Sequence, residues 1–190
     1  MPPKPKVTKQ QILEGAVALV REKGAGALTA KALAARLGCS TQPIFWQYAG
    51  MDELRQEVMR ESLALFGEYL RRENAGVSAY MSVGLNYIRF AREEKYLFRG
   101  LFMGEFGQTG LFDAKVEMEY VLRVIEKNDR ITGERAQVIY KDMWLFSHGI
   151  AAMIAAGTAE FEEGELRKML TDVYRGLARY LENENKTEKE

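Results

Sequence analysis

The sequence has very little of the chemistry that disulfide frameworks, metal sites and most active sites require. Its 190 residues contain one cysteine, Cys39, and one histidine, His148. A lone cysteine excludes an internal disulfide and fits a reducing compartment, and two distant ligands do not make a metal site. We find no phosphate-binding loop, nucleophile–base set or recognisably spaced carboxylate pair. The sequence therefore predicts neither an enzyme nor a bound cofactor or metal.

Long apolar segments are missing as well. The longest run of small and apolar residues covers positions 149–157, which is far too short to cross a bilayer. The start of the chain is rich in proline and lysine, where a signal peptide would carry an apolar stretch. Hydrophobic residues make up 47% of the chain and charged residues 28%, which is ordinary for a globular protein of one or two domains. We expect a cytoplasmic protein with no membrane partner.

The net charge of zero hides an uneven distribution of charge. Residues 1–48 carry seven lysines and arginines against two glutamates, a balance of +5, so the remaining 142 residues sum to −5. A basic part joined to an acidic remainder is typical of a protein that meets phosphate at one end.

Residues 29–48 have the pattern of two short helices joined by a tight turn, the layout of a helix-turn-helix. Thr29 is placed to cap the first helix, and Gly38 supplies the left-handed residue that ends it. Ser40 is predicted to cap the second helix, whose first turn tolerates Pro43 because a missing N–H costs little there. The second helix begins with small polar side chains that suit base edges in a major groove. This element favours DNA binding.

The hydrophobic periodicity elsewhere also predicts helices, so the expected fold class is all-α. A first helix begins after Thr8 and ends at Gly24, which completes a three-helix head. A connector helix follows over residues 51–74, with further helices over 77–94, 95–103, 112–127, 133–158 and 164–182, about nine in all. The predicted domains are a DNA-binding domain over residues 1–50, with 1–7 as a flexible basic arm, and an effector-binding and dimerisation domain over residues 51–190 that includes the connector.

Residues 27–40, then Ile44, Phe45, Tyr48 and the Asp-Glu-Leu of 52–54, resemble the head of the TetR family of bacterial transcriptional regulators. Residues 87–91, 96–98 and 144–149 are similar to the Trp-His-Gly type of TetR effector domain. The resemblance implies a homodimer that represses transcription until a small molecule binds its body. The sequence departs from the family at Phe45, where members usually have Tyr, and at Met51, where they usually have Lys. Both family residues commonly touch phosphates.

Residues 37–51 carry no formal charge, so we expect few phosphate contacts from the second helix and a shallow dependence of DNA affinity on salt. Gln42 is the best candidate base reader, because its amide can pair with adenine N6 and N7. Trp46 either faces the groove or packs against the connector, while Leu37, Ile44 and Phe45 are expected in the core. The predicted DNA-binding residues are Lys4, Lys6, Lys9, Thr29, Lys31, Ser40, Thr41, Gln42, Trp46, Gln47 and Tyr48.

Aromatic and methionine side chains of the body suit an apolar cavity for a lipophilic or aromatic effector, because they adapt to irregular guests. The same spacing also fits an ordinary helical core. His148 is either a group that hydrogen-bonds an effector or a histidine satisfied within the core or an interface. The predicted effector-binding residues are Tyr87, Phe98, Phe102, Met103, Phe106, Met118, Trp144 and His148.

The last two predicted helices carry a pattern suited to dimerisation. Small residues keep one helix face open to close approach, and leucines and a valine repeat by three and four on the other helix. Such a seam either forms a four-helix bundle between two chains or closes the core of one chain. The predicted interface residues are Gly149, Ala152, Ala156, Leu166, Leu170, Val173 and Leu177.

The predicted function is a transcriptional repressor that leaves a palindromic operator when a small lipophilic or aromatic effector binds. Two alternatives keep the same fold: a regulator that activates transcription, and one whose body senses a protein partner. A nonspecific architectural DNA binder is a third, which competition with random DNA would separate from a specific regulator.

Overall fold

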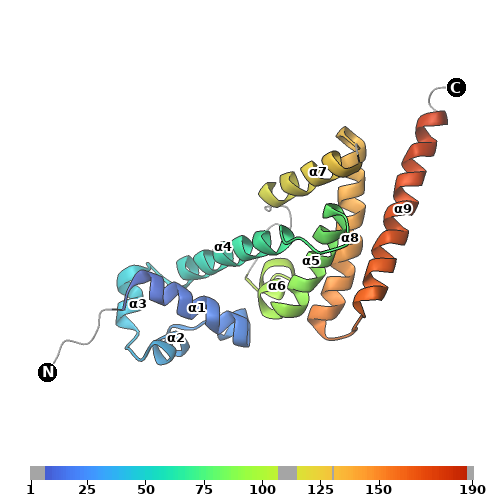
Figure 1. The fold of residues 1–190 in the computed structure, drawn as a ribbon. Coiled ribbons are helices and arrows are strands. Elements are labelled where there is room, and N and C mark those ends of the chain that lie inside the picture. The colour runs from blue at the N-terminus through green and yellow to red at the C-terminus, as the bar shows by residue number, and fades with distance from the viewer. Residues whose placement is uncertain (1–6, 107–114, 130, 188–190) are drawn as a thin grey trace. The chain divides into compact units, whose positions relative to one another are not determined.

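The computed structural model describes residues 7–106, 115–129 and 131–187, and these form helices joined by short connections, with no strand among them (Figure 1). The predicted all-α fold class is confirmed. The elements are α1 (Lys9–Lys23), the short 3-10 helix η1 (Ala25–Ala27), α2 (Ala30–Leu37), α3 (Gln42–Gln47), α4 (Met51–Leu70), α5 (Ala79–Glu93), α6 (Lys95–Phe102), α7 (Lys115–Asp129), α8 (Gly133–Ala156) and α9 (Glu163–Thr187).

The chain divides into two compact units. Unit 1 comprises Met1–Leu65 and Glu94–Leu111, and unit 2 comprises Phe66–Glu93 and Phe112–Glu190. Helix α4 begins in unit 1 and ends in unit 2, as a connector would, and α6 belongs to unit 1 although it follows α5 in the sequence. The predicted boundary at residue 50 falls inside unit 1, and the assignment of separate functions to the two predicted domains stays a prediction.

Unit 1 is built on well-capped short helices. Thr8 caps α1 in a capping box with Gln11, which satisfies backbone donors that the helix itself cannot. Thr29 caps α2 through a bond from the Ala32 N–H, and Gly38 ends that helix in the left-handed conformation. The core of the unit is closed by side chains that are at most 3% exposed: Ile12, Ala16, Leu19, Val20, Leu28, Leu33, Ile44 and Leu54.

The start of α3 differs from the prediction. Thr41, not Ser40, occupies the N-cap position, and no side chain caps the helix. Pro43 stands in the first turn and has no N–H to donate, while the Ile44 N–H bonds to the Thr41 carbonyl oxygen at 3.1 Å. The predicted cap at Ser40 is wrong because the helix begins one residue later, and the donors that a Thr41 hydroxyl would need are absent or already used.

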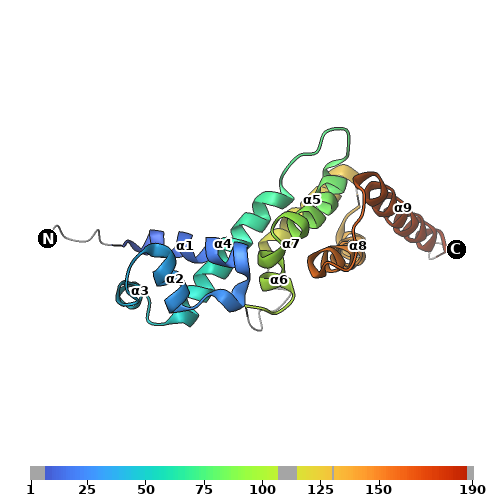
Figure 2. The same ribbon diagram turned by 90° about the horizontal axis from the view of Figure 1, so that it is seen from below.

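Unit 2 is a layered helical body. Helix α5 packs against α8, and α7 and α9 each pack against both of them (Figure 1, Figure 2). Edge-to-face aromatic contacts join the end of α4 to α5, with the Phe66 and Phe90 rings 5.2 Å apart and the Tyr69 and Phe90 rings 5.2 Å apart. Asn86 is fully buried, and its amide donates to the Arg72 carbonyl oxygen at 2.6 Å. This bond ties the connection after α4 to the centre of α5.

The predicted helices of the body all occur, with shifts of a few residues at their ends. The largest shift is in α9, which ends at Thr187 rather than at residue 182, while α4 ends at Leu70 rather than near residue 74. Helix α8 ends at Gly157 in the left-handed conformation, after which α9 runs back along it (Figure 1). In the part of the chain that the structure describes, no helix has the length and apolar character needed to span a membrane.

Candidate nucleic-acid interface

Helix α3 presents one exposed face and one buried face. The exposed side chains are those of Gln42, Phe45 and Trp46. Ile44 is buried, which confirms its predicted place in the core. Residues three and four apart on a helix are neighbours, so Gln42, Phe45 and Trp46 share a single face. We call these three side chains the α3 face. It combines one amide with two aromatic rings and holds no charge.

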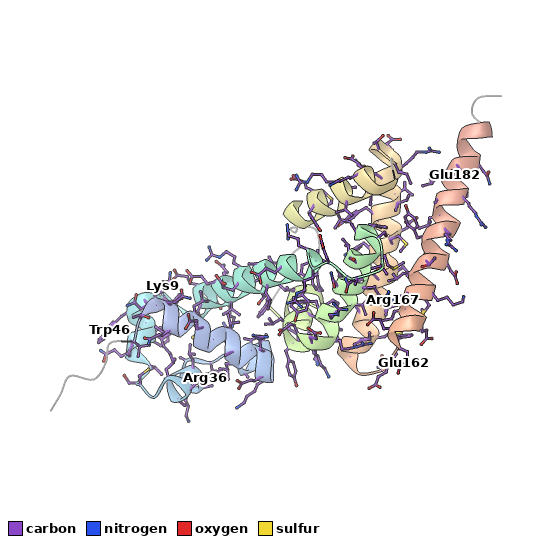
Figure 3. All side chains as sticks on the ribbon, in the orientation of Figure 1. Lys9, Arg36, Trp46, Glu162, Arg167 and Glu182 are labelled. Carbon is purple, nitrogen blue, oxygen red and sulfur yellow. The ribbon has the colours of Figure 1, made fainter. Side chains whose placement is uncertain are left out.

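The two aromatic side chains of the α3 face are both exposed, whereas burial was expected for Phe45 and left open for Trp46. Phe45 is 48% exposed, so its predicted place in the core is wrong. Trp46 is 67% exposed and is labelled on the surface of unit 1 in Figure 3. Of the two alternatives for Trp46, packing against the connector therefore fails, and the side chain lies open to a partner.

Beside α3 lies a cluster of Lys9, Tyr48 and Glu57. The Glu57 carboxylate accepts from the Lys9 ammonium at 2.7 Å and from the Tyr48 hydroxyl at 2.8 Å, and the ammonium lies 4.8 Å from the centre of the Tyr48 ring. The Lys9 ammonium lowers the pKa of Glu57, and burial raises the pKa of Tyr48. Tyr48 is 2% exposed, which argues against its predicted contact with phosphate. The cluster instead fixes the end of α3 to α1 and α4.

Most cations of the head are held by carboxylates. Arg36 makes a bidentate pair with Glu22 at 2.7 and 2.8 Å, and Arg21 makes a bidentate pair with Glu94. On α4, Arg55 pairs with Asp52 and Arg60 lies near Glu57. Among the described residues up to Leu65, only Lys23 and Lys31 form no ion pair. Two charges of the +5 balance of residues 1–48, those of Lys9 and Arg21, are thus neutralised by carboxylates from outside that segment.

The other predicted DNA-binding residues divide into exposed ones and ones that the structure does not describe. Lys4 and Lys6 lie outside the described residues. The exposed set is Thr29, Lys31, Ser40, Thr41, Gln42 and Gln47. Sequence reasoning missed Glu57 and Glu94, because an ion pair between segments far apart in the sequence leaves no local pattern.

Three predicted effector-binding residues come together in unit 2. The Tyr87 hydroxyl lies 2.9 Å from His148 Nδ1, and the Trp144 ring stacks on the imidazole with centroids 5.4 Å apart. Burial lowers the pKa of His148, so the neutral imidazole is favoured. His148 thus has a hydrogen-bonding partner within the chain, as the alternative of a histidine satisfied in the core requires. Its side chain is also partly exposed. Met118, the fourth predicted residue in unit 2, is 36% exposed on α7.

The remaining predicted effector-binding residues belong to unit 1. The Phe98 side chain is fully buried, and its ring lies 5.0 Å from that of Phe102. Phe106 covers Gly100 so closely that a Cβ atom there would lie 2.4 Å from the ring. Met103 ends α6 and is 44% exposed. Phe98 therefore serves the core of unit 1, and Met103 remains accessible.

The predicted dimerisation residues fall into a buried group and a group that is half-buried or exposed. Leu166 and Leu170 are at most 3% exposed and belong to the core of unit 2, where Leu170 packs on Gly84. Their side chains are therefore covered within one chain, and their predicted place in an interface between chains stays a prediction. Val173, Leu177 and Ala152 are half-buried, and Gly149 and Ala156 are exposed. Exposed apolar side chains flank them on α8 and α9: Val138, Leu145, Met153 and Tyr180.

Comparison with known proteins agrees with this architecture. Residues 12–58 match the family model described as bacterial regulatory proteins of the tetR family. Among curated proteins no sequence matches the chain.

Solved structures resemble the chain over nearly its whole length. A TetR-like regulator from Rhodococcus sp. RHA1 aligns with a TM-score of 0.64 and 19% identity, covering 93% of this chain and 98% of that one. A TetR variant from Acinetobacter baumannii AYE in complex with minocycline aligns with a TM-score of 0.59 and 17% identity, covering 94% and 98%. A putative TetR-family regulator from Vibrio parahaemolyticus gives 0.57 and 16%, covering 88% and 96%.

Proposed function

We propose that this chain is a cytoplasmic transcriptional repressor of the TetR type, because residues 12–58 match the family model of the tetR bacterial regulatory proteins and its fold is that of solved TetR structures. In this proposal a homodimer binds a palindromic operator and leaves it when a small lipophilic or aromatic effector binds. The observation that carries the proposal is the exposed α3 face on the second helix of a helix-turn-helix. A regulatory rather than an enzymatic role follows from the same family.

DNA binding is supported by the position and chemistry of α3. The second helix of a helix-turn-helix enters the major groove, and its exposed side chains meet base edges there. Gln42 opens the helix and is exposed, as a residue that pairs with adenine needs to be. Thr29, Lys31, Ser40 and Thr41 are exposed around it and supply hydroxyl and ammonium groups for phosphates.

A homodimer is supported by the exposed apolar residues of α8 and α9. Val138, Leu145, Gly149, Ala152 and Ala156 recur at helical spacing on one side of α8. Contiguous exposed apolar surface on a globular protein marks an interaction site. Two heads held by such a dimer would enter successive major grooves about 34–36 Å apart.

An effector site in the body is supported by the cluster of Tyr87, Trp144 and His148. A neutral imidazole beside a stacked indole offers polar and aromatic contacts together, which suits an aromatic guest. In a two-state switch the effector must prefer the state that does not fit the operator, since a ligand that binds both states equally shifts nothing.

The test is selection of bound sequences from a random DNA pool. We expect enrichment of an inverted repeat whose half-sites are about 10 base pairs apart between centres. Repeating the binding measurement with lipophilic and aromatic compounds should identify one that weakens operator affinity roughly 5- to 150-fold. Gln42→Ala should change the selected sequence. No enrichment of any inverted repeat would refute the proposal.

The Glu57 carboxylate predicts how DNA affinity depends on salt. Glu57→Gln removes the countercharge of Lys9 but keeps an acceptor for the Tyr48 hydroxyl, so Lys9 becomes available to a phosphate. We expect tighter operator binding and a slope of log affinity against log salt that is steeper by about 2 for the dimer. Titrations at several salt concentrations measure this slope. Glu61→Gln, the same charge change one turn along α4, should leave the slope near that of the wild type; equal slopes in all three proteins would contradict the prediction.

A further inference from the structure

Contacts with DNA phosphates do not explain the composition of the α3 face. Phe45 and Trp46 are 48% and 67% exposed, although burying either side chain would be favourable. Both belong to a segment, residues 37–51, that has no charged side chain. A surface of this kind gains little from phosphates and has to gain from apolar contact with its partner.

The pairing of the head's cations strengthens this point. Lys9, Arg21 and Arg36 are each bound to a carboxylate, and in the described residues of the head only Lys23 and Lys31 form no ion pair. Few counterions are then released by the described part of the head, so its nonspecific electrostatic contribution to the affinity is small. More of the affinity must come from direct contact with the bases.

One apolar group marks the sequence in the major groove. Thymine presents its 5-methyl group there, whereas the other three bases present hydrogen-bonding groups only. Gln42 shares the α3 face with the two aromatic rings and offers the amide that pairs with adenine. An amide and two rings side by side match neighbouring A·T pairs, where adenine edges and thymine methyl groups alternate.

Resting on the proposed function, we infer that Phe45 and Trp46 determine operator specificity by packing against thymine 5-methyl groups. Trp46 has the larger exposed surface and makes the larger contact. Half-sites selected by this protein contain thymine next to the adenine that Gln42 contacts.

The experiment replaces thymine by uracil, one position at a time, in the operator selected by the wild-type protein. Uracil keeps every hydrogen-bonding group of thymine and removes only the methyl group. We expect one or two thymines per half-site at which the replacement weakens binding about 4-fold, and about 15-fold when both half-sites carry it. Positions outside the α3 contacts should show no change.

Variants assign the effect to the two side chains. Trp46→Ala and Phe45→Ala should each bind more weakly and lose the sensitivity to uracil at their own thymine. Because both side chains are exposed, circular dichroism should show unchanged helix content. Lys31→Ala, the matched control at a predicted phosphate contact, should weaken binding to thymine and uracil operators by the same factor.

The outcomes separate this inference from the proposed function. If the protein selects an inverted repeat but tolerates uracil at every position, the inference is overturned and the repressor proposal stands. Sensitivity to uracil that persists in both alanine variants also overturns it. If no DNA sequence is selected, both fall together.

Discussion

Replacing Arg21 with methionine is expected to destabilise the head by about 2 kcal/mol, the largest effect we expect from a single change at the ion pairs of the described residues. Only 5% of the Glu94 side chain is exposed, and among the described residues no other cation pairs with it. Removing one partner of a buried pair costs about 3–5 kcal/mol, since the remaining charge is left without a countercharge. The Arg21 side chain is 49% exposed, which lets water screen part of that cost.

The two ends of this pair should respond unequally. Glu94→Gln leaves a half-exposed guanidinium that water solvates, so we expect a loss of about 1 kcal/mol or less. The double variant Arg21→Met with Glu94→Gln should be more stable than Arg21→Met alone, because no uncompensated carboxylate remains. Urea unfolding followed by circular dichroism measures the three differences. Equal losses in the two single variants, or strictly additive losses in the double variant, would contradict a buried charge on Glu94.

The pair also bears on how the head is built. It joins α1 to the residue that precedes α6, and α6 packs against α1 and η1. Gly24 continues this contact, since a Cβ atom there would lie 3.2 Å from the Tyr96 ring. Helix α6 is therefore a structural part of unit 1, and loss of the pair should loosen α6 together with the head.

Local patterns predicted the helices of this chain well. The caps at Thr8 and Thr29 and the terminators at Gly24 and Gly38 are where the sequence places them, because capping depends on residues within four positions. The cap predicted at Ser40 failed because the N-cap position falls on Thr41, where Pro43 and the bonded Ile44 N–H leave no donor for a capping side chain. The assignment of α6 to unit 1 has no counterpart in local sequence, since it depends on packing between distant segments.

The candidate interface was predictable in part, for a related reason. Polar residues at the start of α3 are exposed as expected, but the exposure of Phe45 depends on which face of α3 the core covers. Six residues are too few for a hydrophobic period to settle that orientation. The charge balance of residues 1–48 overstates the unpaired positive charge for a similar reason, because Glu57 and Glu94 neutralise Lys9 and Arg21 from distant positions.

Replacing Leu145 with aspartate is expected to convert the proposed dimer into a monomer and to weaken operator binding by at least about 100-fold. Leu145 is 51% exposed on the same side of α8 as Val138 and Ala152. Two carboxylates facing each other across a two-fold interface would be desolvated without partners, which costs several kcal/mol. A monomer binds one half-site only and loses the gain in effective concentration that a linked second head provides.

The control for this prediction is Arg175→Asp, an exposed site on the side of α9 opposite Val173. It changes the charge by more than Leu145→Asp does but leaves the apolar side of the helix intact, so the variant should remain dimeric. Sedimentation velocity at micromolar concentration reports the association state, and operator titration reports the affinity. If the Leu145→Asp protein remains dimeric, the interface does not lie on this side of α8. A wild-type monomer with full operator affinity would remove the dimer from the mechanism, because the paired half-sites would then have to be read independently.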